Sequence, residues 1–159
     1  MFELTIIGGG PAGIAAGVYA SRKQLKTLFI TKDWGGQSIV SEEIQNWIGT
    51  PAISGSQLAL DLKAHLHKYA GDYVEIKDNS LVSHLTKQDD GFLITLDNGE
   101  TYESKTVLVA SGSKRRQLSA LNADKFEQKG LTYCASCSGP VFAGQDVVVI
   151  GGGYAAIEN

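Results

Sequence analysis

The stretch that decides the fold is Phe2-Glu3-Leu4-Thr5-Ile6-Ile7-Gly8-Gly9-Gly10-Pro11-Ala12-Gly13. Its apolar half is typical of a buried strand, and a proline suits the first turn of a helix because its missing N–H would be unpaired there anyway. A helix of small residues to about Lys23 and a second strand over Thr27–Thr31 follow. This order predicts a parallel βαβ unit, the core of a Rossmann-like α/β fold.

Three glycines of this stretch match the dinucleotide pattern G-x-G-x-x-G. The first makes a tight turn, the second lets the backbone approach a pyrophosphate, and the third lets helix and strand pack closely. We predict a nucleotide site, against the alternative of a purely structural turn. The predicted contacts are Gly8, Gly10, Pro11, Ala12 and Gly13. Asp33, about 20 residues on, is a candidate to bind the ribose, against the alternative of a polar loop residue.

The next segment changes style, from a parallel unit to antiparallel strands. A long loop over 32–55 precedes a helix over 56–69, whose residues Leu58, Leu62, Leu66 and Tyr69 share one face. Short strands are predicted at 74–76, 81–87, 91–96 and 101–104, with an Asn-Gly hairpin turn at 98–99. The pattern predicts an antiparallel β-meander inserted into the parallel fold, before a buried strand over 106–110 returns to the sheet.

Composition sets limits on the function. The chain has 159 residues, 43% of them apolar, and a formal net charge of −3. No basic stripe indicates nucleic-acid binding, and no apolar run approaches the ~18 residues of a membrane span. The N-terminus enters a strand at once, without the pattern of a secretory leader. We therefore expect a cytoplasmic protein that binds neither nucleic acid nor membrane.

The two cysteines form a single CxxC motif, Cys134-Ala135-Ser136-Cys137. Such motifs can lower the pKa of one thiol to ~7 or below, which makes a nucleophile for disulfide exchange. Zinc is the first alternative, but it needs four ligands, and His65 and His67 point to different faces of a helix. We therefore expect no metal. A pair of inert core cysteines is the second alternative, which the small polar neighbours disfavour.

A second glycine loop closes the chain. Gly151, Gly153 and Ala156 match G-x-G-x-x-A after a predicted buried strand over Val147–Ile150, which indicates a nicotinamide dinucleotide loop. Because its helix has only begun at Asn159, we expect this loop to be a signature rather than a working site. The alternative is that this segment packs on the first domain or frays. We expect a first domain over 1–115 and the start of a second, incomplete nucleotide-binding domain over 116–159.

Several motifs occur together in one order: Gly8–Gly13, Gly35-Gly36-Gln37, Gln45-Asn46-Trp47, Ala110-Ser111-Gly112, Cys134–Cys137, Ser138–Phe142 and Gly151–Ala156. In that order and approximate spacing the whole chain resembles the low-molecular-weight thioredoxin reductases and the flavoprotein subunit of alkyl hydroperoxide reductase. The family is one of FAD-dependent pyridine nucleotide-disulfide oxidoreductases.

The resemblance implies a function and a set of site residues. It implies FAD on the first loop near Gly36, Gln37 and Asn46, with Ala110-Ser111-Gly112 closing over it. It implies that Cys134 exchanges with the partner and that Cys137 faces the flavin. Electrons would pass from NAD(P)H through FAD to this disulfide, and on to a thioredoxin-like or peroxiredoxin-type protein. Family members are commonly homodimers.

Three departures from the family pattern qualify this expectation. Ser138 stands where the family usually places a proton-shuttling aspartate, and a serine hydroxyl cannot titrate near neutral pH. The usual Pro-Gly turn is absent from 117–124. Family members carry about as much chain again. We therefore expect weak or no turnover from these 159 residues alone, and two alternatives stay open: a nucleotide-binding fragment without turnover, and an interaction module without flavin.

Overall fold

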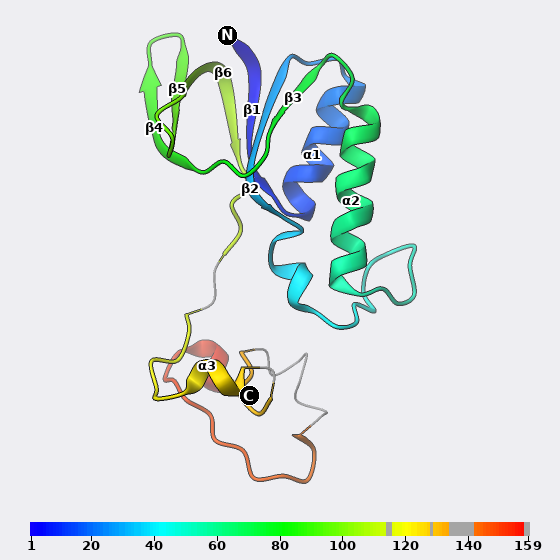
Figure 1. Ribbon diagram of the computed structural model, residues 1–159, viewed down its shortest axis with the longest axis vertical. Helices are drawn as coiled ribbons and strands as arrows, with labels where there is room; N and C mark the ends of the chain where they lie inside the picture. Colours follow the sequence, from blue (N-terminus) through cyan, green and yellow to red (C-terminus); the bar gives the residue numbers. More distant parts are fainter. Residues whose placement is uncertain (114–115, 128, 134–141, 158–159) are drawn as a thin grey trace. The chain divides into compact units, whose positions relative to one another are not determined.

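The computed structural model describes residues 1–113, 116–127, 129–133 and 142–157, and for Ala155 the backbone alone. The chain divides into two compact units, Met1–Lys114 and Arg115–Asn159. The first unit contains all of the β-strands that the structure assigns, and the second contains two short helices (Figure 1).

The first unit is built on one six-stranded sheet with the strand order β3-β2-β1-β6-β5-β4. The elements are β1 (Phe2–Gly9), α1 (Pro11–Arg22), β2 (Thr27–Trp34), the 3-10 helix η1 (Gly36–Val40), α2 (Gly55–Ala70), β3 (Val74–Lys77), β4 (Val82–Gln88), β5 (Gly91–Leu96) and β6 (Thr101–Val109). Strands β3, β2, β1 and β6 are parallel, and β6, β5 and β4 form the antiparallel meander. The predicted α/β fold with an inserted meander is confirmed.

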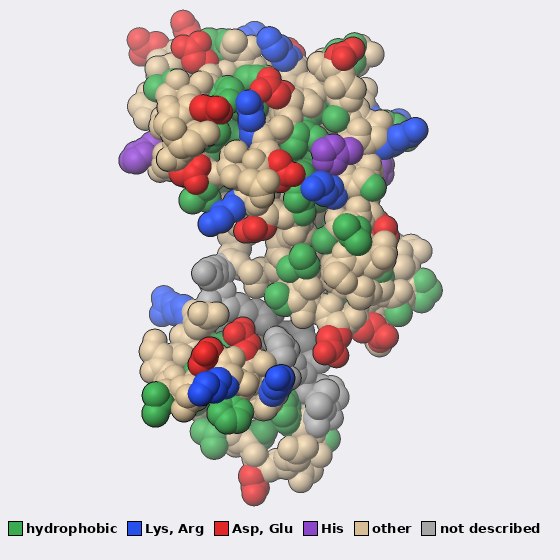
Figure 2. Space-filling view, in the orientation of Figure 1, with side chains coloured by type: hydrophobic (Ala, Val, Ile, Leu, Met, Phe, Trp, Pro, Cys, Tyr) green, Lys and Arg blue, Asp and Glu red, His purple; other side chains and the backbone are tan. Residues whose placement is uncertain are grey.

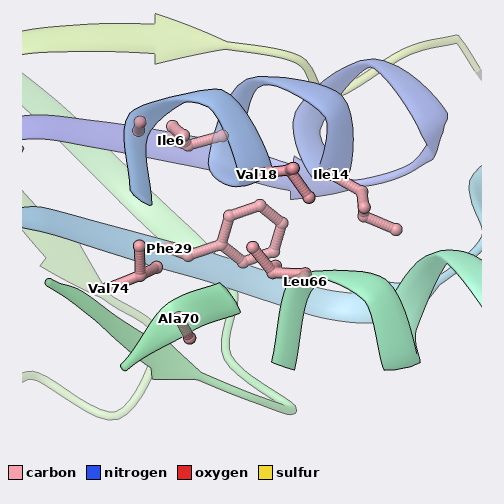
Figure 3. Close-up of a cluster of buried hydrophobic side chains, with 8 residues drawn as sticks. Ile6, Ile14, Val18, Phe29, Leu66, Ala70 and Val74 are labelled. Atoms are coloured by element: carbon pink, nitrogen blue, oxygen red, sulfur yellow. The ribbon is translucent and has the colours of Figure 1, made fainter. Parts of the chain in front are cut away.

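Both faces of β2 are buried. On one face Phe29 packs in a cluster with side chains of α1, α2, β1 and β3, which are Ile6, Ile14, Val18, Ala20, Leu66, Ala70 and Val74 (Figure 3). On the other face Leu28 and Ile30 pack against Ile94 and Leu96 of the meander. The meander thus covers the sheet face opposite the helices, and every residue over 27–31 is buried.

Strand β6 joins the two halves of the sheet. Residues Thr101–Ser104 pair antiparallel with β5, and Ser104–Val109 pair parallel with β1. We predicted two strands here, and the structure shows one, because the chain passes from the meander into the parallel sheet without a turn. The expectation that 106–110 is buried was wrong at Leu108 and Val109, which are 41% and 59% exposed.

Helix α2 begins and ends where its sequence indicates. The Ser54 hydroxyl accepts the Gln57 N–H at 3.2 Å, and Gly71 ends the helix with φ +48°. Leu58 and Leu66 are buried, as their shared face predicts. Tyr69 departs from that prediction and is 45% exposed. The predicted loop over 32–55 starts later, because β2 continues to Trp34 and η1 follows.

The second unit contains two four-residue helices, α3 (Ala123–Phe126) and α5 (Tyr154–Ile157). The buried strand predicted over Val147–Ile150 was wrong: these residues form no strand, and their side chains are between 52% and 86% exposed. No described strand pairs with them, and an apolar run without a neighbouring strand cannot bury its backbone polar groups in a sheet.

Candidate functional site

The first glycine loop joins the carboxyl end of β1 to the start of α1. Gly10 precedes the helix with φ −80° and ψ 178°, and its carbonyl oxygen accepts the Ile14 N–H at 3.0 Å. No described side chain caps the first turn, and no acidic residue lies in it. The first N–H groups of α1 are therefore open to an anion from outside the chain.

Two glycines of the loop are required by packing within the protein. Gly8 has φ +124°, and a Cβ there would overlap the carbonyl oxygen of Ala110. A Cβ at Gly13 would overlap the carbonyl oxygen of Gly8. The first glycine therefore brings β1 against the end of β6, and the third brings α1 against β1.

Gly10 differs, because nothing inside the protein requires a glycine there. Its φ and ψ suit any residue, and the one atom within 4 Å of a Cβ at Gly10 is the Cα of Gly36, at 3.8 Å. The space in front of Gly10 is thus free of described side chains and lies beside the open N–H groups of α1. This geometry fits a ligand that lies directly against the backbone, as a pyrophosphate does.

The turn after β2 forms the opposite side of this space. Gly35 and Gly36 have φ +86° and +56°, and the Gly35 N–H donates to the Gly9 carbonyl oxygen at 2.8 Å. A Cβ at Gly36 would lie 3.2 Å from the Cα of Gly10, and one at Gly35 would lie 2.5 Å from the Cβ of Ala59 on α2. The turn is therefore held between the first glycine loop and the start of α2.

Asp33 lies beside the same loop, in an irregular part of the β1–β2 pairing. The register runs to the pair Ile7–Ile30 and then shifts, so that Gly9 pairs with Trp34. The Thr31 hydroxyl donates to the Asp33 carbonyl oxygen at 2.6 Å across this irregularity. The Asp33 side chain is exposed and has no hydrogen-bond or ion-pair partner among the described residues. Its carboxylate is free to accept hydrogen bonds from a ligand.

The structure brings some of the remaining predicted residues to this loop, but not Asn46. Ala110 donates its N–H to the Ile7 carbonyl oxygen at 2.8 Å and leads into Ser111 and Gly112, so this turn adjoins Gly8. Gln37 is exposed at the start of η1. Asn46 lies in another exposed segment, where residues 45–51 line a shallow cavity of about 400 Å³.

A polar cluster lies at the carboxyl ends of β2 and β3. The Trp34 Nε1–H donates to Asp78 Oδ1 at 2.8 Å, and Lys63 Nζ lies 3.3 Å from Asp78 Oδ2 and 4.8 Å from the indole centroid. Burial alone would raise the pKa of Asp78, but the hydrogen bonds from Trp34 and Lys63 outweigh it and lower the pKa below its usual value. Acidic and basic side chains are interspersed over the first unit on the face shown in Figure 2.

The second glycine loop forms a turn and one turn of helix. Gly151 has φ +141°, and a Cβ there would lie 3.2 Å from the Cβ of Ala156. The N–H groups of Ala156 and Ile157 donate to the Gly153 carbonyl oxygen at 3.0 and 3.2 Å. Because no strand precedes this turn among the described residues, it lacks the sheet that would support a dinucleotide.

Cys134, Cys137 and Ser138 lie outside the described residues, as does most of the segment predicted to follow them. Just before them, the Tyr133 hydroxyl accepts the Leu118 N–H at 2.9 Å and lines a cavity of about 170 Å³ in the second unit. The roles of the two cysteines therefore stay predictions.

Three residues of the site escaped the sequence prediction: Gly9, Thr31 and Gly35. A Cβ at Gly9 would overlap Thr31 Oγ1, and the N–H of Gly35 donates to Gly9. Thr31 ends the apolar run of β2 with a hydroxyl, which was the one available signal. Its partner could not be found from sequence, because the register shift that brings Asp33 into reach belongs to the paired sheet.

A protein-family model described as pyridine nucleotide-disulphide oxidoreductase matches residues 2–159. The chain belongs to this family. Its members depend on FAD and NAD(P)H. The pyridine nucleotide-disulphide oxidoreductases that it resembles include two curated proteins with 37% identity, NADH dehydrogenase of Bacillus subtilis over 157 residues and alkyl hydroperoxide reductase F of Xanthomonas campestris pv. phaseoli over 158 residues. Each match covers 99% of this chain and 30% or 29% of the relative.

Solved structures of the family share the fold. Thioredoxin reductase from Streptococcus pyogenes matches with a TM-score of 0.84 and 35% identity, and that from Giardia duodenalis with a TM-score of 0.85 and 30% identity. Each match covers 99% of this chain and 50% of the solved chain. The chain therefore spans about 30% of the curated relatives named above and about half of these solved proteins.

The residues present fit the dinucleotide end of FAD. The fit rests on the open space at Gly10, the uncapped N–H groups of α1 and the unpaired Asp33 carboxylate. Among the described residues, no three His, Cys, Asp or Glu side chains gather as metal ligands do. In the same part of the chain, no helix combines the length and apolar character needed to cross a bilayer.

Proposed function

We propose that the first unit holds FAD at the first glycine loop and that the protein is a flavin-dependent disulfide reductase. The observation that carries the proposal is Gly10, whose backbone conformation and surroundings require no glycine unless a ligand lies against it. The membership of the chain in a FAD- and NAD(P)H-dependent family supports the same assignment.

Each part of the site has a proposed task. The N–H groups after Pro11 bind the pyrophosphate, aided by the positive end of the α1 dipole. Asp33 accepts hydrogen bonds from the ribose hydroxyls, and Ala110-Ser111-Gly112 with Gly36, Gln37 and Asn46 lie toward the flavin. FAD, when bound, supplies two-electron transfer from NAD(P)H to a disulfide. The turn Gly151–Ala156 binds the nicotinamide dinucleotide in the intact protein.

The cysteines carry the electrons onward in this proposal. Cys134, as a thiolate, attacks a disulfide sulfur of a thioredoxin-like or peroxiredoxin-type protein and forms a mixed disulfide. Cys137 then attacks Cys134, which releases the reduced partner and restores the Cys134–Cys137 disulfide. The partner thereby gains two electrons and two protons. Since Ser138 cannot titrate near neutral pH, the proton for the leaving thiolate comes from water or from another acid.

An FAD-binding chain without turnover is the second candidate. The observation in its favour is that Val147–Ile150, which should support the second dinucleotide, forms no strand in the described structure. Anaerobic addition of NAD(P)H to the FAD-loaded chain separates the two candidates. Bleaching of the flavin absorbance, followed by reduction of thioredoxin, supports the reductase, and bound flavin that does not bleach supports the second candidate. Failure to bind FAD would contradict both.

A further inference from the structure

Thr31 occupies a position that no comparison assigns, between the glycine loop and Asp33. Its side chain is 3% exposed, and its hydroxyl donates to the Asp33 carbonyl oxygen at 2.6 Å. Its own carbonyl oxygen accepts the Ser80 N–H at 3.0 Å. The end of β2 is thereby tied to the segment that follows β3.

The hydroxyl of Thr31 closes an irregular section of the sheet. Between the pairs Ile7–Ile30 and Gly9–Trp34, the one residue Gly8 on β1 lies opposite the three residues 31–33 on β2. Such a bulge redirects the side chains that it contains, and bulges are frequent beside functional sites. Here the redirected part includes Asp33, whose carboxylate has no partner among the described residues.

Thr31 also lies directly against the glycine loop. A Cβ at Gly9 would overlap Thr31 Oγ1 and lie 2.9 Å from Thr31 Cβ, so the backbone of Gly9 rests on this side chain. One side chain therefore contacts both structures that the proposed FAD site needs, the loop before α1 and the bulge carrying Asp33.

We infer that Thr31 is a positioning residue for the cofactor site: its hydroxyl holds the bulge in the shape that presents Asp33 to the ribose of the dinucleotide. The inference rests on the proposed FAD site. Thr31 does not touch the ligand in this assignment and acts through Asp33.

The test uses the full chain and isosteric variants. T31V removes the hydroxyl and keeps the shape, whereas T31S keeps the hydroxyl. T27V is the matched control, because Thr27 is also buried on β2 and its hydroxyl donates to the Leu25 carbonyl oxygen at 2.9 Å, at the far end of the strand. For each chain, the affinity for FAD is measured by quenching of flavin fluorescence, and the stability without FAD by thermal unfolding.

We expect T31V to weaken FAD binding by about three- to tenfold, the effect of losing one hydrogen bond. We expect T31S to stay within about twofold of wild type, and T27V to destabilise the chain as T31V does without changing the affinity. In a D33N background the effect of T31V on FAD affinity should fall below about twofold, because residues that act through one another are not additive.

Two results would overturn the inference while leaving the FAD site intact: equal affinities for T31V and T27V, or an undiminished T31V effect in D33N. A wild-type chain that takes up no FAD would overturn both the inference and the proposed site. If T31V does not fold, Thr31→Cys replaces it, since its thiol keeps the volume and is only a weak donor.

Discussion

The carbonyl oxygen of Ala110 occupies the place that a side chain at Gly8 would take, although the two residues lie at opposite ends of the first unit's sequence. This contact fixes the end of β6 against the first glycine loop. It explains why the turn after β6 reaches the proposed cofactor site.

Replacing Gly8 should therefore destabilise the fold itself. Gly8→Ala combines φ +124° with an overlap against backbone, and we expect a loss of more than about 2 kcal/mol in the free energy of unfolding. Gly99→Ala is the control, because Gly99 has φ +88° but nothing within 4 Å of a Cβ. It should cost about 1 kcal/mol. Equal losses in urea unfolding would show that the Ala110 contact adds nothing.

Gly10→Ala should show the opposite behaviour, with a stable fold and lost FAD binding. A poorer helix cap and a less flexible unfolded chain have opposite effects of about 0.5–1 kcal/mol each, so stability should change little. FAD affinity should fall at least about tenfold, because the methyl group enters the space of the pyrophosphate. Gly152→Ala, also in open space, is the matched control for flavin titrations. Normal FAD affinity in Gly10→Ala would remove the main support for the site.

Thr5→Val should stabilise the protein. Thr5 is fully buried on β1, and its hydroxyl has no hydrogen-bond partner among the described residues. Replacing the hydroxyl by a methyl group removes an unsatisfied buried polar atom, worth about 1 kcal/mol. Thr27→Val makes the same change at a buried threonine whose hydroxyl is bonded, and should destabilise by about 1 kcal/mol. Chemical denaturation that finds both variants destabilised would contradict this account of Thr5.

Asp78 should make stability depend on pH under acidic conditions. Its pKa is lowered in the folded state, so its contribution is present above the ordinary carboxyl pKa and is lost as the pH falls through the folded value. Asp78→Asn should lower the free energy of unfolding by about 0.5 kcal/mol at neutral pH, the size typical of an exposed ion pair, and by less in acid. Asp72→Asn removes an exposed carboxylate with no described partner and should leave the pH profile unchanged. Parallel profiles for wild type and Asp78→Asn would refute the assignment.

The two cysteines should differ in their effect on bound flavin. If Cys137 faces the flavin, Cys137→Ser should change the visible spectrum of the FAD-loaded chain more than Cys134→Ser does. Cys134→Ser should instead abolish exchange with the protein partner, because it removes the attacking thiolate. The comparison needs equal flavin content in the two variants. Indistinguishable spectra would withdraw the assignment of Cys137.

Local patterns anticipated most elements of the first unit. The apolar run before Gly8, the small residues after Pro11 and the Gly71 stop place β1, α1 and the end of α2 because each signal acts within a few residues. Val147–Ile150 has the same kind of apolar run yet forms no strand. A strand needs a partner for its backbone hydrogen bonds, and local sequence does not show whether one is present.

The glycine spacing, the CxxC motif and their order were enough to indicate the family, because these signals need no knowledge of which strands pair. Three features became visible only in the folded sheet: the open space at Gly10, the Ala110 contact with Gly8, and the bulge that Thr31 closes across to Asp33. The register between β1 and β2 and the path of β6 bring these residues together. Register and path are properties of strands paired over long sequence separations, which a pattern of neighbouring residues cannot encode.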